Sequence, residues 1–431
     1  MRTEHLLRLA RAACAVGVLA LPPDVRAQDR EAEPRSATTT VFARYASRIL
    51  KIQVVEVASA AKVATGTGFF VAADGTMMTN YHVISDWIHE PENYRIEVLD
   101  DAGDPTVASV LTVDVIADLA ILATGKPVPQ HFTLGPAELL QGDRLYSLGH
   151  PGDLGLSIVE GTYNGLLRHT LYPKIHFTGS INPGMSGGPT ITSAGRVVGV
   201  NVSTMGNQRS FLVPQDRASA LLAKAQAAGF TPPERFLDLV AEQVRAFQEA
   251  YLSTMFDGEV PNVEVGRFRV VTEPTDIFRC WGDADREPDR LYETLDHSCS
   301  TDDYVYIADR QGSGVIRFRH QVIRSTGLSA RRFTNYFQSV FQRDHTPGGS
   351  EKHVAPWECT SRNVRVAETT MRAVYCLRKL RKLGELYDAV VKVAVLGDAQ
   401  TGLISTLTLS GVSAANAERL STRYLELVSW R

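Results

Sequence analysis

Three segments of the chain carry the side chains that acyl transfer through a serine requires. His82 follows an apolar run that ends in MMTNY, Asp118 lies within IADLAIL, and Ser186 lies within SINPGMSGGPT. A serine hydroxyl at its ordinary pKa is a weak nucleophile. It needs an imidazole to accept its proton and a carboxylate to orient and stabilise the resulting imidazolium. The order His, Asp, Ser therefore predicts a nucleophilic site if folding brings the three segments together.

The backbone around Ser186 is bare, since Gly184, Gly187 and Gly188 flank it closely. Acyl transfer needs backbone N–H groups aimed at the developing oxyanion, and neighbouring side chains would obstruct that approach. Each candidate also has a simpler interpretation: a glycine-rich turn without a function, a histidine bonded at a strand end, and a surface carboxylate. Asp114, four residues before Asp118, competes with it for any role.

The length and composition indicate a globular protein with more than one domain. At 431 residues the chain is too long for one ordinary core and suggests two domains, or three. Hydrophobic residues make up 44% and charged residues 22% of it. A formal net charge of -3 gives no reason to expect a nucleic-acid partner.

The N-terminus has the basic, apolar and small-residue order of a secretory signal. Three arginines precede an apolar run from Ala12 to Leu21, and two prolines and VRA follow it. The run is about half the roughly 20 residues that a membrane-spanning helix needs, so we expect no stable membrane span. We interpret residues 1–27 as a signal peptide cleaved after Ala27, and we expect a secreted or periplasmic protein.

The cysteines agree with export. Removal of the signal would remove Cys14 and leave Cys280, Cys299, Cys359 and Cys376. Their spacing lacks the paired Cys-x-x-Cys pattern or the histidine partners of a zinc site, so an oxidising compartment favours disulfides. Four cysteines allow three pairings, of which we favour the two local ones.

The pattern of short apolar runs and turn residues between Val41 and Pro214 indicates an all-β region. Gly149, Pro151 and Gly152 separate two groups of short strands, which favours two antiparallel barrels. We expect this domain to span residues 41–229.

After this region the short-strand pattern gives way to apolar residues at helical spacing. Residues 230–258 predict a helical linker, with Thr231 as its cap and Val240 and Val244 on its apolar face. Residues 260–431 predict a smaller α+β domain, with hairpins at 302–323 and 386–410. Two amphipathic helices are indicated there by apolar residues at helical spacing: Phe333, Phe337 and Phe341, and later Leu420, Tyr424 and Val428.

The region of about 41–225 resembles the trypsin-like serine proteases, and among them the bacterial HtrA/Deg branch. TGTGFFVAADGTMMTNYHVI is similar to that branch's histidine motif, DLAIL to its aspartate motif, and INPGMSGGPTITSAGRVVGVN to its serine motif. The resemblance implies a chymotrypsin-like double barrel. It also implies that Ser186 is the nucleophile, His82 the general acid and base, and Asp118 the orienting carboxylate. The family's oxyanion donors map to the backbone N–H groups of Gly184 and Ser186.

The chain departs from its relatives at three places. Met185 stands where many trypsin-like enzymes carry an aspartate that pairs with a newly cut N-terminus, so we expect no activation by that route. Ser180 stands where enzymes specific for basic residues carry a carboxylate, which favours a small or medium apolar preference in the specificity pocket. After residue 230 we find no glycine-rich loop of the kind with which PDZ domains bind peptide carboxylates.

We expect no metal and no cofactor. The histidines outside the triad show no paired metal spacing, and the carboxylates near Asp283 are interpreted as a solvated turn. A run of basic residues could bind an acidic partner but is more typical of a solvated face: Arg378, Lys379, Arg381 and Lys382.

These observations favour an exported serine endopeptidase that acts on unfolded or extended protein segments through an acyl-enzyme. The alternative is a protease-shaped binding or chaperone-like protein in which the triad is retained but idle. Protein or peptide substrates are the expected partners, and the sequence leaves the oligomeric state open.

Overall fold

The computed structural model describes residues 36–204, 209–253, 255–301, 303–343, 346–366 and 368–430. The predicted signal peptide, residues 1–27, lies outside the described residues. Residues Ala37–Arg431 form one compact unit. Within its described residues, no helix is both long enough and apolar enough to cross a membrane.

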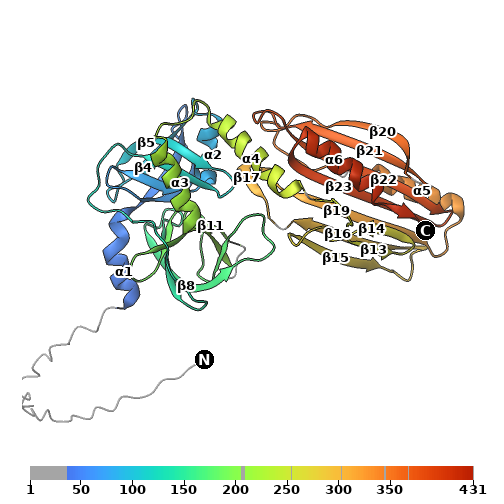
Figure 1. Cartoon of the computed structure of the whole chain (residues 1–431), viewed down its shortest axis with the longest axis horizontal. Helices are drawn as coiled ribbons and strands as arrows, with labels where there is room; N and C mark the ends of the chain where they lie inside the picture. Colours follow the sequence, from blue (N-terminus) through green and yellow to red (C-terminus); the bar gives the residue numbers. More distant parts are fainter. Residues whose placement is uncertain are drawn as a thin grey trace, which may run out of the picture. The chain divides into compact units, whose positions relative to one another are not determined.

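The first half of the all-β region closes into a six-stranded antiparallel barrel (Figure 1). Its strands are β1 (Ile49–Glu56), β2 (Lys62–Phe70), β3 (Thr76–Thr79), β4 (Tyr94–Leu99), β5 (Pro105–Asp114) and β6 (Leu119–Ala123), in the order β1-β2-β3-β6-β5-β4. Helix α1 (Ala37–Tyr45) precedes the barrel, and helix α2 (Tyr81–His89) follows β3 almost directly. Closure leaves no unpaired sheet edge and fixes where β3 ends, and therefore where α2, the helix that carries His82, begins.

The second barrel has the same number of strands. They are β7 (Arg144–Gly149), β8 (Ser157–Leu166), β9 (Ile175–Phe177), β10 (Pro189–Ile191), β11 (Val197–Thr204) and β12 (Ser210–Pro214), in the order β10-β11-β12-β9-β8-β7. Helix α3 (Gln215–Ala227) follows, and buried side chains of this helix join a core that both barrels share. The predicted double antiparallel barrel is confirmed.

Helix α4 (Phe236–Leu252) occupies the segment predicted as a helical linker. It begins after Arg235, so the expected cap at Thr231 is wrong. Val240 and Val244 are fully buried and belong to the same apolar cluster as the first barrel. This helix is therefore packed onto the barrel along its apolar face.

The C-terminal region is built around a seven-stranded antiparallel sheet in the order β15-β16-β19-β23-β22-β21-β20. Its strands are β15 (Phe278–Asp285), β16 (Tyr292–Thr301), β19 (Ile316–Ser325), β20 (Glu358–Val366), β21 (Thr369–Lys379), β22 (Leu386–Asp398) and β23 (Thr401–Ser413). Smaller sheets are formed by β13 (Asn262–Val265), β14 (Phe268–Val271) and β24 (Ser429–Trp430), and by β17 (Val305–Ala308) with β18 (Gln311–Ser313).

Both predicted C-terminal helices exist. Phe333 and Phe337 are buried on α5 (Ala330–Gln342), and Leu420 and Tyr424 on α6 (Ala414–Glu426). Val428 lies beyond the end of α6, although it is buried.

One of the two predicted hairpins is present as β22–β23, whereas the other is divided. The predicted hairpin at 302–323 becomes β17–β18, and β19 leaves it for the large sheet. Gly314, at φ +87°, turns the chain between β18 and β19, a conformation that favours glycine. Its N–H donates to the carbonyl of Ser410, 3.2 Å away, at the start of the new pairing.

The two disulfides have the local pairing favoured from the sequence. Cys280 is bonded to Cys299 across β15 and β16, and Cys359 to Cys376 across β20 and β21. Each pair joins residues that stand directly opposite in neighbouring strands.

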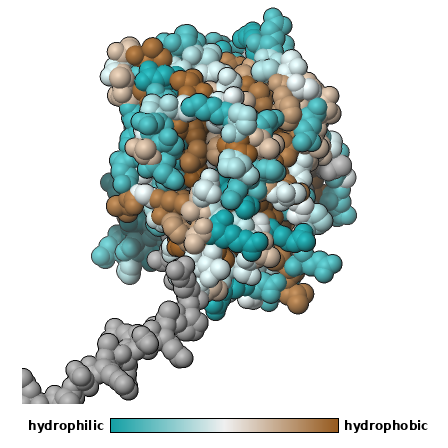
Figure 2. Space-filling model, turned by 90° about the vertical axis from the view of Figure 1, so that its left-hand side faces the viewer, coloured by the Kyte–Doolittle hydropathy of each residue, from teal (hydrophilic) through white to brown (hydrophobic). Residues whose placement is uncertain are grey.

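The basic run in β21 and the following loop is neither a free patch nor a solvated face throughout. Arg378 is 6% exposed, forms an ion pair with Asp388 at 2.8 Å and lies over the ring of Trp357. Lys382 donates to the carboxylate of Glu90 at 2.6 Å. On the face drawn in Figure 2, polar residues surround separate groups of apolar ones.

Candidate active site

His82 and Asp118 meet at the end of the first barrel. His82 is the second residue of α2, and its backbone N–H donates to Asp118 Oδ1 at 2.8 Å. The ring atom Nδ1 lies 2.6 Å from Asp118 Oδ2. One carboxylate therefore contacts both the main chain and the imidazole of His82, which fixes the ring and makes Nδ1 the protonated nitrogen of the neutral form.

Asp118 is held in a sparsely populated backbone conformation between β5 and β6, with φ +55°. Its carbonyl accepts hydrogen bonds from Asn80 Nδ2 at 2.7 Å and from the N–H of Tyr81 at 3.2 Å. Asn80 is fully buried, and sequence reasoning missed it. The one available signal was an amide two residues before the candidate histidine, directly after the short strand β3.

The surroundings of His82 set its affinity for a proton. Burial lowers the pKa of the imidazole, but the charge of Asp118 and the hydrogen bond to it act in the opposite direction and prevail, so the pKa is raised above 6.5. The side chain remains 27% exposed, so the imidazole is accessible to a reactant.

Asp114, the competing carboxylate, bonds to the main chain of the residues that follow it. Its Oδ1 accepts hydrogen bonds from the N–H groups of Ile116 at 3.0 Å and Ala117 at 2.9 Å. It therefore stabilises the turn that directly precedes Asp118.

Ser186 lies in the loop between β9 and β10, and this loop is packed against the strand that leads to His82. The carbonyl of Ser186 accepts from the N–H of Thr67 on β2 at 2.8 Å. Gly187, at φ +85°, comes so close that an added Cβ would be 2.3 Å from Thr79 Oγ1 and 2.9 Å from the nitrogen of Asn80. A Cβ on Gly66 would lie 2.6 Å from the side chain of Val83 and 3.2 Å from the carbonyl oxygen of Ser186.

The structure thus brings the serine segment against the residues on either side of His82. Within the described residues, Ser186 Oγ and His82 are not hydrogen-bonded to each other. Such contacts are often long in the absence of substrate.

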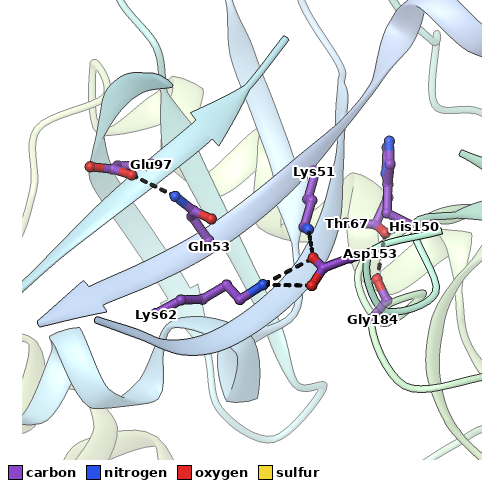
Figure 3. Close-up of polar contacts among 8 residues, drawn as sticks. All are labelled: Lys51, Gln53, Lys62, Thr67, Glu97, His150, Asp153 and Gly184. Atoms are coloured by element: carbon purple, nitrogen blue, oxygen red, sulfur yellow. Dashed lines mark hydrogen bonds and ion pairs between the residues drawn. The ribbon is translucent and has the colours of Figure 1, made fainter. Parts of the chain in front are cut away.

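The carbonyl groups of the loop are fixed one after another. Thr67 Oγ1 donates to the carbonyl of Gly184 at 2.7 Å and accepts from the N–H of His150 at 2.9 Å, as Figure 3 shows. The carbonyl of Met185 accepts from Asn201 Nδ2 at 3.1 Å. The carbonyl of Pro183 accepts from the N–H of Gly152 at 3.1 Å.

These bonds also orient the N–H groups of the loop, because the C=O and N–H of a trans peptide point in opposite directions. The N–H of Gly184 belongs to the same peptide as the Pro183 carbonyl, and the N–H of Ser186 to the same peptide as the Met185 carbonyl. Among the described residues neither N–H has a protein acceptor, whereas the N–H of Met185 donates to the carbonyl of Asn182. Both N–H groups are available to a bound anion.

A second connection joins the barrels beside this loop. Asp153 bonds to Lys62 of β2 at 2.9 Å and forms a short contact with Lys51 of β1 (Figure 3). The Asp153 side chain is 71% exposed, so the pairs contribute little free energy. They do place the 150–153 turn against Gly184, where an added Cβ would be 2.4 Å from the carbonyl oxygen of His150.

The two other residues singled out near the nucleophile differ in burial. Ser180 is exposed, and its carbonyl accepts from Asn182 Nδ2 at 3.4 Å. Met185 is fully buried in an apolar cluster with Phe177 and Leu212. An ammonium group could find no partner at that position.

One group of residues in the described chain has the size of a metal site: Cys280, His297 and Cys299. The two cysteines are joined by a disulfide and therefore offer no thiolate ligands.

Comparison with known proteins agrees with the barrels and their motifs. Residues 66–200 match the family model of the trypsin-like peptidase domain. The mitochondrial serine protease HTRA2 of Bos taurus is 32% identical over 174 residues, which are 38% of this chain and 37% of that protein. A "Probable periplasmic serine endoprotease DegP-like" of Chlamydia trachomatis is 30% identical over 165 residues, 37% of this chain and 32% of that one.

A crystal structure of the serine endoprotease from Yersinia pestis is also similar, at 25% identity and a TM-score of 0.39, over 46% of this chain and 68% of that one. This chain spans about a third of the length of the curated relatives it matches. Over the matched region the chain is similar to the trypsin-like peptidase domain of HtrA proteases, and the resemblance inferred from the three motifs is confirmed.

Proposed function

We propose that the peptidase domain hydrolyses peptide bonds as a serine endopeptidase, with Ser186, His82 and Asp118 as its triad. We place this domain at residues 41–229, the helical linker at 230–258 and the α+β domain at 260–431. The relationship to HtrA serine proteases supports the reaction class.

The observation that carries the proposal is the double contact of Asp118 with His82, together with the packing of the serine segment on Thr67, Thr79 and Asn80. Ser186 Oγ would attack the substrate carbonyl while His82 Nε2 accepts its proton. The imidazolium would then give that proton to the leaving amine, and water would release the acyl group by the same exchange. Asp118 stabilises the imidazolium throughout.

The N–H groups of Gly184 and Ser186 would bind the oxyanion. Since the bonded carbonyls on the far side of each peptide already fix their directions, little reorganisation is needed when charge develops. One donor of this kind typically contributes about 3 kcal/mol to transition-state stabilisation.

We further propose unfolded or extended protein segments as substrates. Ser180, the residue assigned to the specificity pocket, carries no charge to pair with Lys or Arg. Cleavage after small or medium apolar residues is therefore expected, and a peptide-library profile dominated by Lys or Arg would contradict it.

The site of action would be periplasmic or extracellular. Two disulfides fit an oxidising compartment, and a relative of similar sequence is described as periplasmic. Residues 1–27 would be the signal that exports the chain.

The experiment compares hydrolysis of an unfolded protein by the wild type, Ser186→Ala and Ser193→Ala. Ser193 lies exposed at the tip of the hairpin between β10 and β11 and is the matched control. Ser186→Ala should lower turnover on the order of a million-fold, and Ser193→Ala should retain the wild-type rate. Equal protection of a client protein by the wild type and by Ser186→Ala, without cleavage by either, would favour the binding or chaperone-like alternative.

A further inference from the structure

The helix that carries His82 is held from outside the barrels, by the β17–β18 hairpin. Tyr81 and His89 both donate to the carbonyl of Ile307, from Oη at 2.8 Å and from Nε2 at 3.2 Å. Between them, Ser85 Oγ lies 3.3 Å from the hydroxyl of Tyr306. Residues 81, 85 and 89 recur at four-residue spacing, so they form one stripe along α2 that faces the hairpin.

This contact is part of a core. Val305, Ile307 and Ala308 are buried in the same apolar cluster as Tyr81, Val83, Ile84 and Ile88. Ile307 is fully buried. The hairpin therefore completes the packing around α2.

The C-terminal end of α2 is fixed as well. Lys382 donates to the carbonyl of His89 at 3.1 Å and to Glu90 at 2.6 Å, and Lys352 pairs with Glu90 at 3.0 Å. Cations at this end of a helix also interact favourably with its dipole. Contacts from residues beyond 300 thus fix α2 over its whole length.

Tyr306 is the member of the hairpin that reaches His82. The two rings meet edge to face, with centroids 6.0 Å apart and planes at 73°. Through its hydroxyl Tyr306 also contacts Ser85, whose Oγ donates to the carbonyl of His82 at 3.1 Å. Tyr306 therefore contacts the imidazole of His82 directly and the carbonyl of His82 through Ser85.

We propose that Tyr306 is a positioning residue of the active site, which holds the His82 imidazole against Asp118 and limits its contact with water. The proposal rests on the proposed function, because it assigns His82 the role of general base. It makes the C-terminal domain a structural part of the peptidase site. The hairpin borders His82 without covering it, since 27% of that side chain stays exposed.

The titratable groups around His82 make the proposal measurable. Asp118 supplies the charge that acts on the imidazole. Tyr81 on α2 and Tyr306 on the hairpin stay neutral, because burial raises the pKa of both hydroxyls, that of Tyr306 to about 12. Replacing Tyr306 therefore changes the hydration of His82 without changing a nearby charge.

The test uses Tyr306→Ala and Tyr306→Phe in the full chain, with Tyr304→Ala as the matched control. Tyr304 precedes β17 and is 50% exposed. The pKa of His82 is measured by NMR titration of labelled histidines, and kcat and KM are measured against pH. Circular dichroism reports whether each variant is folded.

Tyr306→Ala should shift the pKa of His82, upward if water reaches the ring and downward if the ring moves away from Asp118, and should lower kcat by roughly 10- to 100-fold with little change in KM. Tyr306→Phe keeps the ring and should retain the wild-type pKa and most of the rate. Tyr304→Ala should match the wild type in both.

The proposal would be overturned if folded Tyr306→Ala kept the wild-type pKa of His82 and the wild-type pH below which kcat falls, even if its melting temperature were lower. Failure of the wild type to hydrolyse any substrate would instead contradict the proposed function. The NMR titration would still test the contact of Tyr306 with His82.

Discussion

Thr67 on the first barrel donates its hydroxyl to the carbonyl of Gly184 on the second, over 2.7 Å, while its own N–H donates to the carbonyl of Ser186. One buried residue therefore forms hydrogen bonds to two peptides of the candidate oxyanion loop.

Thr67→Val removes the hydroxyl and keeps the shape of the side chain. The carbonyl of Gly184 and the N–H of His150 would lose their partner, which costs about 1–3 kcal/mol of stability. We expect kcat to fall about 100-fold, because the peptide that lies between the two donor N–H groups loses its anchor and both donors can shift. Thr67→Ser should restore most of the rate in a steady-state assay, and equal rates for Thr67→Val and the wild type would contradict the role of this bond.

Asp118→Asn tests the carboxylate. The amide cannot stabilise an imidazolium and favours the wrong tautomer of His82, so kcat should fall on the order of 10⁴-fold. Asp114→Asn is the matched control. It weakens the turn at residues 116 and 117 and should lower the melting temperature more than the rate. A greater loss of turnover in Asp114→Asn would reverse the assignment.

The rate should depend on pH through His82. A general base acts in its neutral form, and the pKa of His82 is raised above 6.5 by Asp118 despite its burial. The value of kcat/KM should therefore fall as the pH drops, with a midpoint above 6.5, when measured at substrate concentrations well below KM. A midpoint clearly below 6.5 would show that burial outweighs the carboxylate.

Stability should depend on pH through His89, which the hairpin contacts. Burial, and then the nearby His353, lower its pKa to about 4. An unfolded chain binds a proton here below about pH 6.5, whereas the folded chain does so only near pH 4. The folded state therefore loses about 1.4 kcal/mol per pH unit through this residue as the pH falls across that window.

Urea denaturation between pH 4 and 6.5 should detect this term. His89→Gln keeps a donor for the carbonyl of Ile307 and removes the titration, so its stability should vary less steeply with pH than that of the wild type. Parallel curves would show that His89 is not the group responsible.

The sequence was sufficient where a structural feature depends on local pattern. The three motifs predicted His82, Asp118 and Ser186, and the two groups of short strands predicted both barrels. Cysteines on neighbouring strands also paired locally, because β15–β16 and β20–β21 place them directly opposite each other.

The sequence failed where a residue's partner lies far along the chain. Thr67 on β2 and Asn80 at the start of α2 are ordinary polar residues until the loop at 184–187 and Asp118 are placed beside them. Tyr81, Ser85 and His89 form a stripe whose partner begins more than 200 residues later. Arg378 and Lys382 were read as surface residues because nothing nearby in the sequence indicates Asp388 or Glu90 as their partners.

The most direct test of the central claim is site-mapped labelling with an organophosphonate, followed by mass spectrometry of the wild type, Ser186→Ala and His82→Ala. We predict one adduct, on Ser186, formed by the wild type, absent from Ser186→Ala and strongly slowed in His82→Ala. Labelling at another serine, or equal labelling rates with and without the imidazole, would contradict the account.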